Sequence, residues 1–262
     1  MIRKRLYRNE RATTGGRALA RAAGLIVLNR GSTWRGRPQD VIVNWGAADD
    51  HLGEPRRCRW LNHPDAVARA VDKIETLKAL DAANVPTLEW TTQLEEASRW
   101  HEEDGIVIGR RLLCASAGKG IIVCKRNEEG HPGHLPSDFP RTPLWTRYFK
   151  GSDEFRIHVA GGKVIDRQQK RRRLDEDGNH DATNEVRNLD NGWVFCRDEV
   201  EQIEMADSAA CAAVAGLGLD FGAVDLKVNA QRTRVGVLEV NTAPGLEGTS
   251  LQVYARAIGE MV

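Results

Sequence analysis

The sequence lacks the long apolar runs by which membrane and secreted proteins are recognised. No stretch approaches the ~18 apolar residues that a membrane-spanning helix needs. Residues 1–11 are basic, but they lack the apolar segment that a secretory signal requires. These absences predict a protein of the cytoplasm that has no membrane partner.

Cysteine is also scarce, and its few copies are scattered along the chain. There are five cysteines, an odd number, and no two of them form a Cys-x-x-Cys pair. This pattern favours reduced thiols over a disulfide framework, in agreement with a location in the cytoplasm. No Ser-His-Asp or Cys-His arrangement is evident either, so the sequence does not indicate nucleophilic catalysis by a side chain.

Charge is balanced overall but unevenly distributed. The net charge is +1, yet residues 1–37 hold ten Arg and Lys residues against the single acid Glu10. A second basic cluster comprises Arg167, Lys170, Arg171, Arg172 and Arg173. Such clusters can bind nucleic acid, and they also suit a site that handles a triphosphate and a carboxylate. For residues 1–11 a solvated surface is an equally good interpretation, so nucleic acid stays open as a partner.

Two apolar runs near the C-terminus predict a β-hairpin. Residues 223–228 and 234–240 flank a polar turn, and Asp225, Glu239 and Asn241 can lie on one face of the two strands. Three oxygen donors that converge among Val and Leu residues suit a hard divalent cation such as Mg²⁺. The alternative is an edge hairpin whose polar residues face solvent, but the apolar surroundings favour the metal site.

These residues also carry a family resemblance. The D…E-x-N arrangement, followed by T-A-P-G-L and T-S-L, resembles the ATP-grasp superfamily, and within it the D-alanine–D-alanine ligases and the RimK-like ligases. The resemblance covers roughly residues 62–258. It implies that Asp225, Glu239 and Asn241 hold two Mg²⁺ ions, or Mn²⁺ in their place, against the phosphates of ATP.

The order of the expected elements indicates an α+β chain. We expect helices at 16–23, 62–71, 72–81, 95–104 and 201–215, strands at 25–28, 40–45, 106–108 and 121–125, hairpins at 155–166 and 223–240, and a mobile loop at 170–184. The resemblance implies an ATP-grasp fold in which two α+β lobes clamp ATP. The expected division is a short α/β N-terminal domain (1–61), an N-terminal lobe (62–144) and a C-terminal lobe with the metal site (145–262).

One set of residues is assigned to the nucleotide. Small residues and a lysine between two strands let backbone N–H groups approach phosphate oxygens, and the resemblance implies a mobile phosphate loop there. The ligases place a lysine on the strand before this loop, where the present chain offers Arg110 or Arg111, and the sequence leaves the choice open. The resemblance implies that the nucleotide-binding residues are Lys73, Arg110 or Arg111, Ser116, Gly118, Lys119, Gly120, Thr146, Tyr148, Glu154 and Leu238.

A second set is assigned to the substrates and to catalysis. Glu154, Arg156 and His158 alternate on one strand face, which is costly unless they are paired or meet a ligand. We expect Arg156 to face the site, Glu154 to pair or contact the nucleotide, and His158 to be structural. Arg187, on a predicted turn, and Lys170, in the second basic cluster, are the other catalytic candidates.

One position departs from the family pattern. D-alanine–D-alanine ligases carry an arginine two residues before the first metal-binding aspartate, and this chain has Ala223 there. Arg156 or Arg187 would then neutralise the acyl phosphate, which weakens the case for D-alanine as substrate. Gly245 and Ser250 match the segment that binds the carboxylate of the second substrate, and a helix starting near Ser250 would add free N–H groups.

The resemblance therefore implies an ATP- and Mg²⁺-dependent carboxylate–amine ligase that works through an acyl phosphate. Two alternatives stay open at this point. One is a RimK-like ligase that modifies a protein or peptide terminus. The other is a non-catalytic protein that uses the fold to bind ATP or nucleic acid. The sequence identifies neither substrate nor the oligomeric state, although a dimer is compatible with it.

Overall fold

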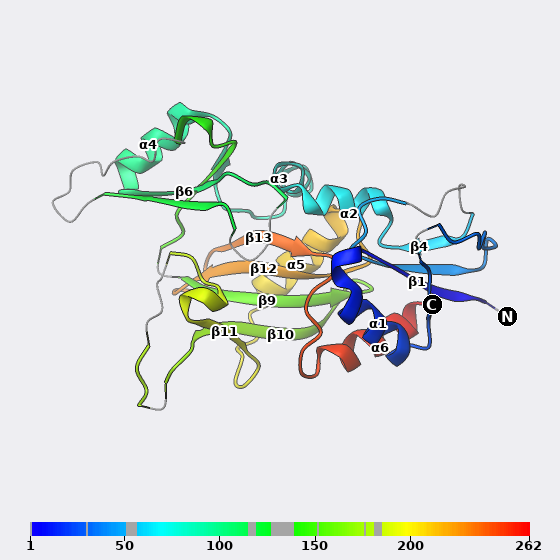
Figure 1. Ribbon diagram of the computed structural model, residues 1–262. Helices are drawn as coiled ribbons and strands as arrows, with labels where there is room; N and C mark the ends of the chain where they lie inside the picture. The colour runs from blue at the N-terminus through cyan, green and yellow to red at the C-terminus, as the bar shows by residue number, and fades with distance from the viewer. Residues whose placement is uncertain are drawn as a thin grey trace.

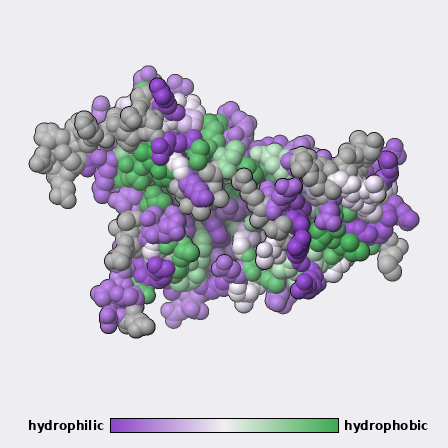
Figure 2. All heavy atoms as spheres, viewed as in Figure 1, coloured by the Kyte–Doolittle hydropathy of each residue, from purple (hydrophilic) through white to green (hydrophobic). Residues whose placement is uncertain are grey.

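The molecule is elongated and contains three β-sheets, which are numbered here in the order of the sequence. In Figure 1 the third sheet lies between the other two. The computed structural model describes residues 2–29, 31–50, 57–114, 119–126, 139–150, 152–175, 177–180 and 185–262. Ser116 and Gly118 of the expected phosphate loop lie outside these residues. Of the described helices, none is long and apolar enough to cross a bilayer. The face shown in Figure 2 is mostly hydrophilic, with smaller hydrophobic areas between the charged side chains.

The first sheet is parallel and has the order β2-β1-β3-β4. Its strands are β1 (Lys4–Arg8), β2 (Ile26–Val27), β3 (Val41–Trp45) and β4 (Arg59–Leu61), and α1 (Thr13–Ala22) joins β1 to β2. The expected helix and the strands near 25–28 and 40–45 are present. The sequence analysis missed β1 and β4, because their lysine and arginine residues hide the apolar alternation of a strand.

The second sheet, with the order β5-β8-β6-β7, forms the lobe at the upper left of Figure 1. It consists of β5 (Trp90–Thr91), β6 (Ile106–Arg110), β7 (Ile121–Lys125) and β8 (Leu144–Arg147), with α4 (Leu94–Asp104) packed on it. Gly109 allows the close approach of the Trp145 ring, because a Cβ at this glycine would lie 2.5 Å from a ring carbon. The sheet extends to Arg147, slightly beyond residue 144, where the N-terminal lobe was expected to end.

The third sheet is antiparallel and contains the predicted hairpins. Its order is β11-β10-β9-β12-β13, with β9 (Ser152–Ala160), β10 (Lys163–Arg172), β11 (Trp193–Cys196), β12 (Phe221–Asn229) and β13 (Val235–Asn241). The expectation of a mobile loop from residue 170 is wrong at its start, because Lys170, Arg171 and Arg172 continue β10 and pair with β11. Their charges disguised the strand.

Three helices cover one face of this third sheet. They are α2 (Pro64–Val71), α3 (Lys73–Ala82) and α5 (Glu204–Gly216), and they share a hydrophobic core with β9, β12 and β13. The predicted cap of α3 is present, because the Asp72 carboxylate accepts hydrogen bonds from the N–H groups of Ile74 (2.9 Å) and Glu75 (3.1 Å). α2 and α3 thus pack with the third sheet, and the three-part division of the chain stays a prediction.

The last helix packs the C-terminal end of the chain against its N-terminal part. α6 (Ser250–Met261) packs beside α1, where Tyr254 and Ile258 share a core with Leu6, Leu19 and Trp45 of the first sheet (Figure 1). This packing brings the start of α6 and the chain before it to a fixed place beside the third sheet.

Candidate functional site

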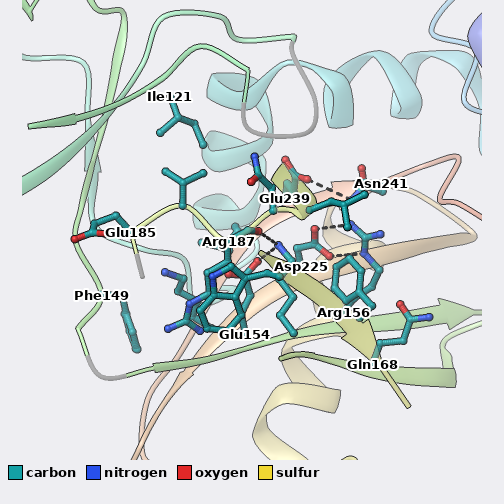
Figure 3. Close-up of a pocket in the computed structure, with 18 of the residues that line it drawn as sticks. Ile121, Phe149, Glu154, Arg156, Gln168, Glu185, Arg187, Asp225, Glu239 and Asn241 are labelled. Atoms are coloured by element: carbon teal, nitrogen blue, oxygen red, sulfur yellow. Dashed lines mark hydrogen bonds and ion pairs between the residues drawn. The ribbon is translucent and has the colours of Figure 1, made fainter. Parts of the chain in front are cut away.

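A cavity of about 560 Å³ lies between the second and third sheets. Its wall includes Ile108, Arg110 and Thr146 from the second sheet. The third sheet contributes Glu154 and Asp225, which are labelled in Figure 3. A cavity of this size holds a small molecule. Cationic side chains outnumber acidic ones in its lining, so it suits an anionic ligand.

The predicted metal-binding residues lie together on this wall. Asp225 on β12 is directly opposite Glu239 on β13, and Asn241 lies two residues further along that strand. The Asn241 amide lies 3.4 Å from a Glu239 carboxylate oxygen (Figure 3). Among the described residues, no group of three or more His, Cys, Asp or Glu side chains could hold a metal ion. The group at this wall is of a different kind, because it combines two carboxylates with the amide of Asn241. An all-oxygen donor set of this kind fits Mg²⁺.

Arg156 forms a bidentate ion pair with the first of these residues. Its Nε and Nη2 atoms lie 2.7 and 2.8 Å from the two carboxylate oxygens of Asp225, which is the cross-strand neighbour of Arg156. Burial raises the pKa of Asp225, but the charge and hydrogen bonds of Arg156 outweigh this effect and lower it. The Arg156 guanidinium also stacks on the Phe195 ring, 4.2 Å from its centroid. Arg156 therefore faces the site, but it is committed to Asp225, and a bound cation would share that carboxylate with it.

The other two catalytic candidates lie on the same side of the cavity. The Lys170 ammonium contacts the Glu154 carboxylate and donates a 2.7 Å hydrogen bond to the carbonyl oxygen of Arg187. The Arg187 guanidinium lies over the Trp193 ring, 4.6 Å from its centroid. The structure thus brings Glu154, Lys170 and Arg187 together, and β11 supplies an aromatic support that the sequence analysis did not anticipate.

Comparison with known proteins was made for both sequence and structure. No protein-family model matches the sequence. The chain is 30% identical over 195 residues to a probable alpha-L-glutamate ligase of Mannheimia succiniciproducens, a match that covers 71% of this chain and 60% of that protein. This chain therefore spans less than two thirds of the length of that relative.

The solved structures decide the fold. The ATP-grasp ligase PsnB in complex with a minimal precursor superposes with a TM-score of 0.68 at 13% identity, and the match covers 100% of both chains. D-alanine–D-alanine ligase from Bacillus anthracis gives 0.64 at 14% identity, covering 99% of this chain and 93% of that one. A RimK domain protein from Sphaerobacter thermophilus gives 0.63 at 14% identity, covering 98% and 99%. The chain has the ATP-grasp fold.

The two arginines between which the sequence left the choice open differ in position. Arg110 lines the cavity, where burial lowers its pKa while the charges of Glu239 and Glu154 oppose that effect. Arg111 is exposed and lies outside the cavity wall, and its N–H donates a 2.8 Å hydrogen bond to the Gly120 carbonyl. Arg110 is thus the residue that can contact a ligand there.

The remaining nucleotide candidates fall into two groups. Thr146, Tyr148 and Leu238 line the cavity. The Lys73 ammonium lies 3.7 Å from a Glu239 carboxylate oxygen, although Lys73 is not part of the cavity wall. Lys119 and Gly120, the described part of the candidate phosphate loop, do not line it either.

Three cationic residues that line the cavity, Arg147, Lys227 and Arg197, escaped the sequence analysis. Lys227 is buried, and burial lowers its pKa to about 8 against the opposing charge of Glu154. Its spacing of two residues from Asp225 puts it on the same strand face, a signal that could have been used. Arg197 follows β11 and contacts Ser250, 53 residues away, so no local pattern predicted it.

His158 has the structural character that was expected. Its ring is buried, and its Nδ1 atom lies 3.0 Å from the hydroxyl oxygen of Tyr254. Burial lowers the pKa of His158 to about 4, so the ring is neutral near pH 7. It therefore joins β9 to α6.

Proposed function

We propose that the protein is an ATP- and Mg²⁺-dependent carboxylate–amine ligase that forms ADP. The observation that carries this proposal is the grouping of Asp225, Glu239 and Asn241 on one wall of a cavity that is otherwise rich in cations. A site with oxygen donors on one side and arginine and lysine side chains on the others suits a metal–triphosphate complex together with a second anion.

The proposed reaction has two steps. A substrate carboxylate attacks the γ-phosphate of ATP, which gives an acyl phosphate and releases ADP. An amine then attacks the acyl carbon, which forms the amide bond and releases phosphate. Bound Mg²⁺ would neutralise phosphate charge and polarise the phosphoryl group. The protein contributes position and electrostatic stabilisation, so no nucleophilic side chain is required.

The nucleotide would occupy the part of the cavity nearest the second sheet. Tyr148 and Leu238 offer apolar surface to the base, while Arg110 and Lys73 are cations for the phosphates. The resemblance assigns Ser116, Gly118, Lys119 and Gly120 to a loop over the phosphates, and this role is part of the proposal. Thr146 and Glu154 would contact the base or the ribose.

The substrates would occupy the part that contains Arg156, Lys170, Arg187, Gly245 and Ser250. Lys170 and Arg187 are the cations that can approach an acyl phosphate, since Arg156 is bound to Asp225. The second candidate is a RimK-like ligase that modifies a protein or peptide. It is favoured by the similarity to PsnB, whose structures contain a precursor peptide, and to the probable alpha-L-glutamate ligase.

Two measurements test the proposed function. A melting curve should shift upward with ATP and Mg²⁺ together, and the shift should disappear when a chelator removes the metal. ADP release should then be stimulated by pairs of carboxylate and amine compounds. Binding of Mg·ATP without stimulated ADP release by any pair would favour the non-catalytic ATP-binding protein over the ligase.

A further inference from the structure

Glu154 lies on the central strand of the third sheet, between two lysines. Its carboxylate lines the cavity from β9 (Figure 3), and the strands on either side, β10 and β12, carry Lys170 and Lys227. Lys227 is the direct cross-strand neighbour of Glu154, and both side chains line the cavity, so they lie on the same face of the sheet. One carboxylate is therefore within reach of an ammonium group from either side.

The two lysines differ in how they contact this carboxylate. The Lys170 ammonium contacts Glu154 and also donates a 2.7 Å hydrogen bond to the carbonyl oxygen of Arg187. The Lys227 ammonium makes no hydrogen bond or ion pair with any residue that the structure describes. It lies over the Tyr148 ring, 5.6 Å from the ring centroid. Glu154 is thus paired with Lys170, and Lys227 lies beside this pair.

Burial makes the position of Lys227 costly. Lys227 is only 7% exposed and Glu154 only 4% exposed, so water solvates neither charge well. The charge of Glu154 attracts the Lys227 ammonium, while the charges of Lys170, Arg187 and Arg110 repel it. A buried ammonium is unfavourable unless a ligand or a rearrangement of its neighbours supplies a counter-charge.

The proposed role of Lys170 supplies such a rearrangement. Lys170 is one of the two cations that can approach an acyl phosphate, but its ammonium contacts Glu154. If Lys170 turned to the phosphate alone, the Glu154 carboxylate would be buried without its partner. Loss of one member of a buried ion pair is strongly destabilising. The cost is removed if a second cation moves onto the carboxylate as Lys170 leaves.

We infer that Lys227 is a positioning residue that pairs with Glu154 when Lys170 turns to the phosphoryl group of the acyl phosphate. This inference rests on the proposed ligase function. The exchange needs only a change of side-chain rotamers, because the backbone of Lys227 already lies opposite Glu154. It keeps the carboxylate neutralised throughout and frees one ammonium for the reaction. Lys227 acts on the substrate only through Lys170.

The exchange predicts that each lysine can replace the other at Glu154, and melting curves without nucleotide measure this. Lys227→Met should leave the melting temperature unchanged or raise it, because it removes a buried ammonium that has no ion-pair partner among the described residues. In a Lys170→Met background the same substitution should lower the melting temperature by at least about 5 °C, since Glu154 would then be buried without a partner. The two changes together should therefore destabilise much more than the sum of their separate effects.

Glu154→Gln and an exposed lysine supply the controls. Glu154→Gln removes the carboxylate charge, so in that background the two lysine substitutions should no longer be coupled. Lys78→Met removes an exposed lysine that pairs with Glu75 on α3, and its effect should simply add to that of Lys170→Met. If the double lysine variant does not fold, adding Glu154→Gln to it should restore folding, and failure to do so counts against the exchange.

Substrate-stimulated ADP release connects the exchange to the reaction. Lys227→Met should lower kcat by about 10-fold with little change in the KM for ATP, because Lys170 would stay on Glu154. Lys227→Arg keeps a cation opposite Glu154 and should restore part of the rate. A residue that only supports the fold would instead change the melting temperature of the single variant.

The inference is overturned if the two lysine substitutions have additive effects on the melting temperature. That result would mean that another cation, such as Arg187 or Arg110, neutralises Glu154. A Lys227→Met protein with the kcat of the wild type would overturn it as well. The melting curves require no nucleotide, so additive effects leave the proposed function intact. A wild-type protein whose ADP release no carboxylate and amine pair stimulates would contradict the proposed function, and with it the role of Lys227.

Discussion

Arg156 and Asp225 face each other across β9 and β12 and form a bidentate ion pair, with N–O distances of 2.7 and 2.8 Å. The pair neutralises a buried carboxylate that also belongs to the proposed metal site. Stability of the ligand-free chain and binding of a divalent cation therefore depend on the same oxygen atoms.

Arg156→Ala should destabilise the ligand-free protein by about 3–5 kcal/mol, because it leaves Asp225 buried without its main partner. Denaturant unfolding measures this change. Addition of Mg²⁺ and ATP should restore part of the lost stability, since the cation replaces the guanidinium as the counter-charge. A variant with unchanged unfolding free energy would show that the ion pair does not stabilise the fold. Arg156→Lys, which retains a charge but not the fork of two N–H groups, is the matched variant.

Glu239→Gln should abolish the Mg²⁺-dependent thermal shift by ATP while the fold stays intact. The substitution removes a metal-binding charge at constant volume, and it also removes the partner that lies 3.7 Å from the Lys73 ammonium. The control is Glu201→Gln, which changes an exposed acid outside the cavity. A normal shift with Glu239→Gln would contradict the assignment of this residue as a metal ligand.

Lys170→Ala and Arg187→Ala should each lower substrate-stimulated ADP release by about 100-fold, the size typical of a lost transition-state contact. The affinity for ATP should change little, because the nucleotide contacts other residues. Lys125→Ala is the control, since this lysine is exposed and pairs with Glu185. Two variants with wild-type rates would show that the substrate side of the site is assigned incorrectly.

His158 should make the protein sensitive to acid. Burial lowers its pKa from the ordinary 6.5 to about 4, so the unfolded chain takes up a proton at a higher pH than the folded one. The stability that depends on a neutral His158 is fully present above about pH 6.5 and is lost as the pH falls towards 4. The loss should be on the order of 3 kcal/mol.

The test compares unfolding free energies of the wild type and His158→Gln between pH 4 and pH 7. The substituted amide can still bond to Tyr254 but does not titrate in this range, so the variant should lose less stability at low pH. Parallel pH profiles for the two proteins would assign the acid sensitivity to other groups.

Gly109→Ala should destabilise the second sheet by about 1–3 kcal/mol, because the new methyl group would lie 2.5 Å from the buried Trp145 ring. Gly259→Ala is the matched control. That glycine lies in α6 with no atom within 4 Å of an added Cβ, so the substitution should be neutral or slightly stabilising. Equal melting temperatures for both variants would contradict the tight packing of Gly109.

The sequence by itself determined the features that depend on local periodicity and local chemistry. Alternation along two strands predicted that Asp225, Glu239 and Asn241 share a face, since side chains on a strand repeat every two residues. Asp72 predicted the start of α3 for a similarly local reason, because its side chain bonds to N–H groups two and three residues ahead. The charged strands β1 and the end of β10 were missed because their residues do not show that alternation.

Only the tertiary structure decided which elements meet. The pairing of Arg156 with Asp225 joins residues 69 positions apart, and that of Arg197 with Ser250 joins residues 53 apart. The choice of Arg110 over Arg111 depends on how the end of β6 lies against the third sheet. Periodicity shows which way a side chain points relative to its own strand or helix. It does not show what lies opposite, because that depends on sheet order and on packing between distant segments.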